Sequence, residues 1–217
     1  MIKRMAMMVR KPDDDSVAFN RYWLDIHGAL VLRSPAVLRY QQNPVIDVVP
    51  CGKAVLAPFH FDGLVELWFR SEEDMDTCFE SPTGRLLCDD EERFLSMITR
   101  HDVEPTPQPA ASYKLLFAAS GAQARTHLAV LANRVANCLD TAVTGIVTNA
   151  VRGVLSRPNL PREQVPADAF AQIFIDASDE FQARDIARQK GVIDVLGTVG
   201  ESFDRFGAYL VFERRVI

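Results

Sequence analysis

The sequence predicts an α+β protein made of two similar halves, each with the element order β-α-β-β-α-β. Segments that alternate as strands and segments with helical spacing follow one another in that order through the first half and then repeat. Between the halves, three prolines lie within five positions, Pro105 to Pro109, which holds the backbone extended and excludes a helix or a central strand. We therefore expect one unit over residues 1–104, a proline-rich linker over 105–111 and a second unit over 112–217.

The first half contains all six elements. Its expected strands are Ile2–Arg10, Leu38–Val49, Gly63–Phe69 and Ser96–Glu104, and its expected helices begin after Asp13-Asp14-Asp15, at Ser71 and at Ser81-Pro82. Acidic residues and serines suit these helix starts because they satisfy free backbone N–H groups and the positive end of the helix dipole. In the first helix, Phe19, Trp23, Ile26 and Leu30 recur at helical spacing and should face the core.

The second half repeats this order. Its expected strands are Tyr113–Ala119, Ala142–Arg152, Ala169–Asp176 and Phe206–Arg214, and its expected helices are Ala122–Leu139 and Asp179–Phe203, the latter broken at Lys190-Gly191. A constant offset of 109 residues places Phe19, Ile26 and Leu30 on Leu128, Val135 and Leu139. Because β-α-β-β-α-β is the ferredoxin-like pattern, the chain is interpreted as two tandem ferredoxin-like units.

This topology has a consequence for ligand binding. The helices of each unit cover one face of its sheet, so the other face must meet water or a second layer. Two units in one chain can supply both walls of a closed α+β barrel without a partner chain. We expect the two sheets to pack on each other and to enclose a cavity suited to a small, mostly apolar molecule.

Composition disfavours several classes of partner. With 24 Lys+Arg against 29 Asp+Glu, the formal net charge is −5, which argues against nucleic acid or an anionic membrane as main partner. No apolar run approaches the roughly 20 residues of a membrane-spanning helix, and the apolar stretch Met5–Val9 is too short for a signal peptide. A cytoplasmic protein is expected. The four cysteines form no CxxC pair and lie at no metal-ligand spacing, which predicts reduced, structural thiols and no metal site.

The same offset locates the candidate site. It aligns Trp23 with Ala132, His27 with Ala136, Glu66 with Ile175 and Trp68 with Ala177. The polar and aromatic side chains therefore belong to the first half, and we expect a single site formed mainly by residues 1–104.

Glu66 is the most informative of these residues. It lies between Leu64 and Trp68 on the strand face opposite the helix-covered one, so it should point between the sheets. Burial there would raise its pKa and make it a candidate general acid or base. Alternatively, Glu66 pairs with a nearby Arg or Lys, such as Arg39, or reaches bulk water.

His27 follows Trp23 by one helical turn. An imidazole beside a cavity can transfer protons near neutral pH; alternatively, it interacts with the helix C-terminal dipole and bonds a carbonyl. Trp23 could contact substrate, and the alternative is that it belongs to the hydrophobic core. On the next strand, Tyr40 and Gln42 share one face and are candidates to line the cavity and hold a carbonyl or hydroxyl group, although an exposed edge strand would carry similar residues.

The sequence contains no Gly-rich phosphate loop, no GxSxG elbow and no metal-ligand spacing. This pattern disfavours nucleotide-dependent and serine-nucleophile enzymes. Acid–base chemistry without a cofactor is the expectation that remains.

Several of these segments resemble the EthD family of the dimeric α+β-barrel superfamily. They are Phe19-Asn20-Arg21-Tyr22-Trp23, His27-Gly28-Ala29-Leu30, Arg39-Tyr40-Gln41-Gln42-Asn43 and Asp62-Gly63-Leu64-Val65-Glu66-Leu67-Trp68-Phe69. The resemblance covers the first half, and the second half is similar to a degenerate copy. Family members usually follow the His-Gly pair with proline, where this chain has Ala29.

The resemblance implies ferredoxin-like units that pair into a barrel, and a role in the breakdown of ethers and aromatic compounds or in polyketide tailoring. Relatives include lactone isomerases and cofactor-free cyclases, decarboxylases and dehydratases, and members are often labelled oxidoreductases. It implies an acid–base role for His27. The choice of Tyr40, Gln42 and Glu66 comes from the strand pattern alone.

The resulting expectation is a catabolic or biosynthetic isomerase or lyase without a cofactor, acting on an apolar, oxygen-bearing compound. His27 and Glu66 would be catalytic, and Trp23, Tyr40, Gln42 and Trp68 would bind substrate. One alternative is a non-catalytic carrier or accessory protein for a partner oxygenase. Another is a haem-binding barrel, because barrels of the superfamily can hold haem through one His. A homodimer through exposed barrel edges also stays open.

Overall fold

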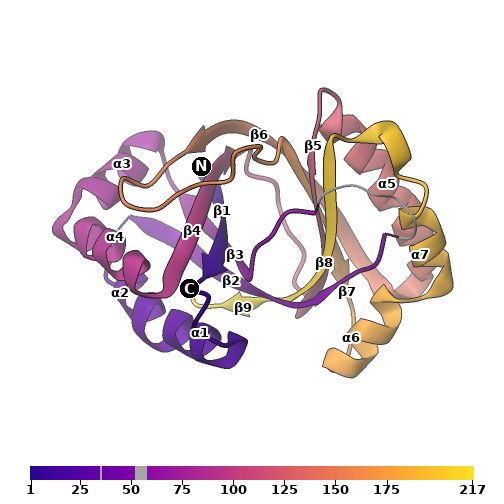
Figure 1. Ribbon diagram of the computed structural model, residues 1–217, viewed down its shortest axis with the longest axis horizontal. Coiled ribbons are helices and arrows are strands. Elements are labelled where there is room, and N and C mark those ends of the chain that lie inside the picture. Colours follow the sequence, from indigo (N-terminus) through magenta and orange to yellow (C-terminus); the bar gives the residue numbers. More distant parts are fainter. Residues whose placement is uncertain (35, 52–57) are drawn as a thin grey trace.

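Two four-stranded antiparallel sheets, one from each half of the chain, join into a closed eight-stranded barrel (Figure 1). The structure is a computed structural model and describes residues 1–34, 36–51 and 58–217. Helices of the first half cover one side of the barrel and helices of the second half cover the other. The expected fold of two tandem ferredoxin-like units that form an α+β barrel within one chain is confirmed.

The elements of the first unit match the expected order. They are β1 (Ile2–Arg10), α1 (Ser16–Tyr22), the π-helical turn η1 (Trp23–His27), α2 (Gly28–Val31), β2 (Val37–Val48), β3 (Gly63–Phe69), α3 (Glu72–Glu80), α4 (Pro82–Phe94) and β4 (Leu95–Val103). The side chains of Asp15, Ser71 and Ser81 accept hydrogen bonds from backbone N–H groups at the starts of α1, α3 and α4, as the sequence predicts.

The second unit repeats this order. Its elements are β5 (Tyr113–Ser120), α5 (Ala124–Leu139), the 3₁₀ turn η2 (Asp140–Ala142), β6 (Val143–Leu155), β7 (Ala169–Ile175), α6 (Glu180–Ala187), α7 (Lys190–Leu196), the 3₁₀ turn η3 (Gly200–Ser202), β8 (Arg205–Phe212) and the short β9 (Arg214–Arg215). The last helical segment is broken as expected, but at Arg188-Gln189, between α6 and α7, and not at Lys190-Gly191, which begin α7.

Hydrogen bonds between strands of different units close the barrel. The strand order is β2-β3-β1-β4-β6-β7-β5-β8, and β8 pairs with β2 again. β4 pairs with β6, with Arg100 opposite Leu155, and β2 pairs with β8, with Val45 opposite Val211. β9 adds to β2 outside this ring. The two sheets therefore meet edge to edge, and their inner faces form one continuous interior.

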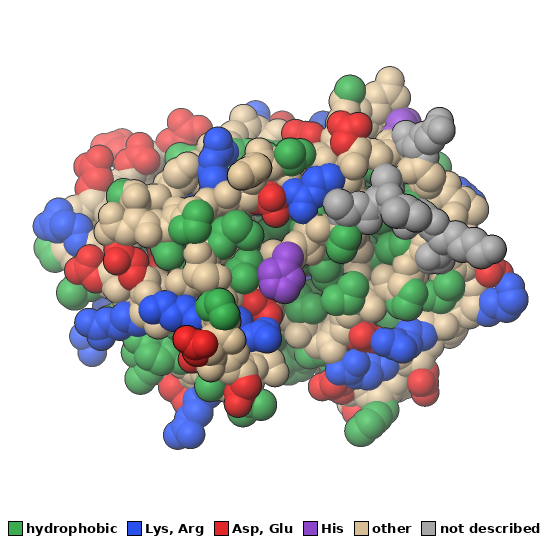
Figure 2. All heavy atoms as spheres, in the orientation of Figure 1, with side chains coloured by type: hydrophobic (Ala, Val, Ile, Leu, Met, Phe, Trp, Pro, Cys, Tyr) green, Lys and Arg blue, Asp and Glu red, His purple; other side chains and the backbone are tan. Residues whose placement is uncertain are grey.

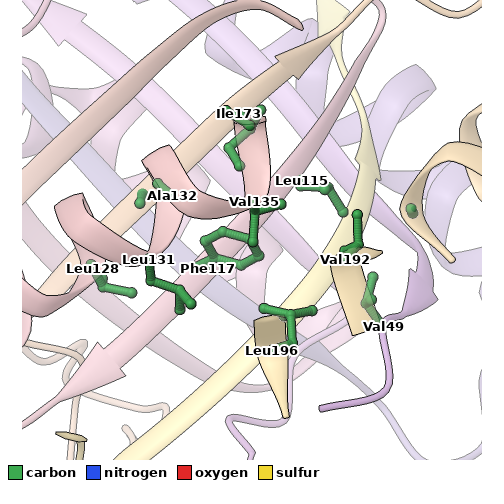
Figure 3. Close-up of a cluster of buried hydrophobic side chains, with 14 of the residues drawn as sticks. Val49, Leu115, Phe117, Leu128, Leu131, Ala132, Val135, Ile173, Val192 and Leu196 are labelled. Atoms are coloured by element: carbon green, nitrogen blue, oxygen red, sulfur yellow. The ribbon is translucent and has the colours of Figure 1, made fainter. Parts of the chain in front are cut away.

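Most of the apolar core lies between the helices and the outer face of the barrel. In the second unit, Leu128, Leu131 and Val135 of α5 point toward Leu115, Phe117 and Ile173 of the sheet (Figure 3). A smaller cluster under the helices of the first unit contains Phe19, Trp23 and Phe94. No helix within the described residues is long and apolar enough to cross a membrane, and Figure 2 shows acidic and basic side chains interspersed over one face of the molecule.

Candidate functional site

A narrow cavity of about 30 Å³ lies between the helices and the sheet of the first unit. Its wall is mostly apolar and includes Trp23, Val31, Leu67 and Phe79, and His27 and Tyr40 also line it. This location corrects the expectation of a pocket between the two sheets. Its lining, mostly apolar with a few polar groups, is of the kind found in small-molecule sites, but its volume is about a tenth of the roughly 300 Å³ at which such sites begin.

A π-helical turn brings His27 to this cavity. The backbone N–H of Gly28 donates to the carbonyl oxygen of Trp23, five residues back, so the turn holds one residue more than an α-helical turn. The extra residue rotates the following side chains. His27 is consequently 6% exposed, whereas Ile26, expected in the core from α-helical spacing, is 49% exposed.

Tyr40 and Gln42 share one face of β2, as predicted, but it is the helix-covered face, because they lie opposite Leu67 and Val65 of β3. The Gln42 Nε2 group donates to the Trp23 carbonyl oxygen at 2.8 Å and to the Tyr40 hydroxyl oxygen at 2.7 Å. Gln42 thus ties the π turn to the sheet. Burial raises the pKa of Tyr40, so its phenol stays protonated near neutral pH.

Asp90 orients the imidazole of His27. Its Oδ2 lies 2.9 Å from His27 Nδ1, and its Oδ1 accepts a hydrogen bond of 2.7 Å from the Tyr22 hydroxyl. Burial raises the pKa of Asp90, but the hydrogen bonds from His27 and Tyr22 outweigh burial and hold this pKa below its usual range.

The ionised state of Asp90 fixes the tautomer of His27. An ionised carboxylate can only accept hydrogen bonds, so Nδ1 of His27 must carry the proton. In the neutral imidazole the lone pair then lies on Nε2, and no partner for Nε2 occurs among the described residues. This arrangement can accept a proton at Nε2 and return it.

Arginines from both units also line the cavity. Arg4 of β1 makes a bidentate pair with Asp102 at 2.6 and 2.9 Å. Arg157, which follows β6, donates from Nη2 to Glu91 Oε1 of α4 at 2.7 Å, and its Nε lies 2.6 Å from Glu91 Oε2 without hydrogen-bond geometry. The segment between β6 and β7 reaches over to β4 and α4 of the first unit (Figure 1), so the second half contributes to a site that was expected mainly within residues 1–104.

Sequence reasoning missed Asp90 and Arg157. Asp90 and Glu91 fall within the spacing of Leu87 and Phe94, on the buried side of α4, and acidic residues in an apolar helical stripe signal buried partners. Arg157 lies in an irregular segment far away in sequence, and no local pattern links it to this cavity.

Glu66 points into the barrel interior, as expected, and is fully buried. Its partners are Lys3 Nζ at 2.5 Å, Lys114 Nζ at 2.9 Å, and the side-chain amides of Asn43, Gln108 and Gln172 at 3.2, 2.9 and 2.9 Å. Burial raises the pKa of Glu66, but the ammonium groups of Lys114 and Lys3 outweigh burial and hold this pKa well below its usual range. The expected upward shift is therefore wrong, because two buried lysines, and not Arg39, face the carboxylate.

Trp68 shares the interior face with Glu66. The Lys3 ammonium lies 5.0 Å from the Trp68 ring centroid, and the Arg39 guanidinium lies 4.5 Å from it. Further along the barrel axis the interior is filled by apolar side chains, including Met5, Met7 and Phe170. The structure thus separates the predicted residues into two groups: His27, Trp23, Tyr40 and Gln42 under the helices, and Glu66 and Trp68 inside the barrel.

A closed barrel of two ferredoxin-like units defines an α+β-barrel protein. The chain is similar in structure to an anthrone oxidase-like protein, with a TM-score of 0.58 and 10% identity over 99% of this chain and 93% of that chain. An EthD family protein from Bacillus halodurans C-125 matches 49% of this chain and 100% of its own length at 15% identity, with a TM-score of 0.40. A search of curated proteins found no match.

Residues 11–97 match the family model of the EthD domain. The first unit therefore contains an EthD domain, and the resemblance predicted from the sequence is confirmed there. The matched range contains η1, β2, β3 and α4, and so includes both His27 and Asp90.

Proposed function

We propose that this chain is a small-molecule enzyme in which His27 is the acid–base group of the cavity under the helices of the first unit. The observation that carries the proposal is the buried imidazole held by an ionised carboxylate at the wall of a mostly apolar cavity. The reaction class is an isomerisation or elimination of an apolar, oxygen-bearing compound, without metal or nucleotide.

In such a reaction His27 Nε2 takes a proton from a carbon beside a carbonyl group. For an isomerase, the imidazolium returns the same proton to another atom of the substrate, so atoms and electrons balance without an oxidant. For a lyase, the imidazolium gives the proton to the departing oxygen, and water or an alcohol leaves. The Asp90 carboxylate stabilises the imidazolium in both cases.

The other predicted residues take different parts in this proposal. Trp23 and Tyr40 contact substrate, because both line the same cavity as His27. Gln42 is a positioning residue, since it holds the Trp23 carbonyl and the Tyr40 hydroxyl. Glu66 and Trp68 lie on the other side of the sheet, where Glu66 is neutralised by lysines, so the proposal gives them no contact with substrate.

A carrier for a partner oxygenase would use the same cavity but would not need an imidazole oriented by an ionised carboxylate. The test is turnover of the compounds handled by enzymes encoded beside this gene. His27→Gln should lower turnover by roughly 10²–10⁴-fold. His127→Gln, at a half-buried histidine of α5 in the second unit, outside the cavity, is the matched control and should leave turnover unchanged. Unchanged turnover in His27→Gln would exclude the acid–base role.

A further inference from the structure

The wall of this cavity includes an arginine, Arg100, that has no carboxylate partner among the described residues. Three guanidinium groups converge on the ring of Phe79: those of Arg4, Arg157 and Arg100 lie 5.0, 5.2 and 5.8 Å from its centroid. All four side chains line the cavity. Guanidinium groups pack well on aromatic faces, but three like charges in one place repel one another unless anions compensate.

Two of the three arginines have carboxylate partners. Arg4 is paired with Asp102 through two hydrogen bonds, and Arg157 forms an ion pair with Glu91 through one hydrogen bond and one close Nε contact. These pairs account for two positive and two negative charges. The guanidinium groups of Arg4 and Arg157 already face these carboxylates, so neither carboxylate is free to neutralise the third arginine.

Arg100 is the third arginine and has no carboxylate within ion-pair distance among the described residues. One of its terminal nitrogens donates to the carbonyl oxygen of Ser156. Its Nε is buried and has no hydrogen-bond partner in the part of the chain that the structure describes. Burial and the neighbouring charges of Arg157 and Arg4 lower the pKa of Arg100 to about 10, so the group remains cationic near neutral pH.

A half-buried cation with a free donor, in the wall of an apolar cavity, is a recognition group for an oxyanion. The guanidinium fork matches a carboxylate best, since two parallel N–H donors meet two oxygens. Val65, Leu67 and Ile98 line the same cavity as Arg100 and His27, which suits a substrate whose body, apart from the anionic group, is apolar.

We infer that the cavity takes a small carboxylate, bound by Arg100 and presenting its apolar part toward His27. This inference rests on the proposed function, because it names the substrate class of the same site. The cavity has a volume of about 30 Å³, far below the roughly 150 Å³ that accommodates a benzene ring, so entry of a flat ring or a short chain requires the lining side chains to move apart.

The experiment compares two pairs of probes by isothermal titration calorimetry. Benzoate and benzamide share shape but differ in charge, and hexanoate and hexanamide repeat the comparison with a flexible chain. In at least one of the two pairs, the wild-type protein should bind the carboxylate at least tenfold more tightly than the matching amide. Arg100→Gln should abolish this preference and leave amide affinity within about twofold.

Arg85→Gln provides the matched control, because Arg85 lies on α4 but is exposed and outside the cavity. It should retain the full preference for the carboxylate. If neither carboxylate binds more tightly than its amide, or if the preference survives in Arg100→Gln, the inference is overturned.

His27→Gln separates this inference from the proposed function. This variant should bind the carboxylate probe as the wild type does, because the inference assigns the carboxylate contact to Arg100 and not to His27. Loss of turnover with intact binding supports both ideas. If the protein shows no preference for the carboxylate probes while its turnover still depends on His27, only the inference of a carboxylate substrate is overturned, and the proposed function stands.

Discussion

At the scale of single residues, side chains from both halves of the barrel contact the buried carboxylate of Glu66. Lys3 belongs to the first unit, and Lys114 and Gln172 belong to the second. A buried ion network is weak evidence for stability by itself, but removing one partner leaves the others buried and unpaired.

Glu66→Gln should therefore destabilise the protein by about 3–5 kcal/mol. The amide keeps the shape but leaves the fully buried Lys3 without a carboxylate partner among the described residues, whereas Lys114 keeps its ion pair with Glu213 at 2.6 Å. Urea denaturation measures the loss. Glu104→Gln is the control, because its pair with Arg152 is exposed and should contribute less than about 1 kcal/mol. Equal effects of the two substitutions would contradict the burial argument.

The same carboxylate predicts a pH dependence. The folded-state pKa of Glu66 is lowered, so its contribution is fully present above the unfolded value of about 4.3 and is lost as pH falls toward the folded value. The free energy of unfolding of the wild type should thus decrease below about pH 4. Glu66→Gln should show a flatter profile over this range, and a profile parallel to the wild type would refute the assignment.

Asp90→Asn tests the positioning of His27. An amide can donate as well as accept, so it no longer forces the proton onto Nδ1. We expect ¹⁵N NMR of His27 to show more of the tautomer protonated at Nε2, and turnover to fall by roughly 10²-fold or more. Tyr22→Phe retains the carboxylate and should keep the wild-type tautomer. A purely structural Asp90 would leave the tautomer of the folded variant unchanged.

At the scale of elements, the sequence predicted the strands and most helix starts but not the faces of the site. Alternation shows that Tyr40 and Gln42 share a face, yet it does not say which side of β2 the helices cover. The π turn breaks the 3.6-residue period, so spacing alone misplaced Ile26. Arg157 reaches the cavity through tertiary contacts that no local pattern encodes.

Gly63 shows how tightly η1 packs on β3. A Cβ added at Gly63 would lie 2.5 Å from Cζ3 of the Trp23 ring, so Gly63→Ala should cost about 1–3 kcal/mol through overpacking and should displace Trp23. Gly153 of β6 is a matched strand position with nothing within 4 Å of the added Cβ. Gly153→Ala should be neutral by thermal denaturation, and a similar loss at both positions would contradict the packing argument.

At the scale of the whole molecule, the tandem barrel was predictable because hydrophobic spacing recurs at one offset in both halves. The edge pairing was not predictable in the same way, since register between distant strands depends on the closed barrel. Pairing of β4 with β6 and of β2 with β8, together with the Glu66 network, joins the two cores. We therefore expect the halves to unfold as one cooperative unit.

The two tryptophans, Trp23 and Trp68, both lie in the first half, so fluorescence reports that half, whereas far-UV circular dichroism reports both. The two signals should give coincident urea transitions. Leu128→Ala removes a fully buried side chain of the second unit and should destabilise by about 2–5 kcal/mol. If the barrel unfolds cooperatively, this substitution shifts the fluorescence midpoint as far as the dichroism midpoint. A fluorescence transition that stays in place would mean that the first unit is stable without its partner half, and that barrel closure contributes little to either core.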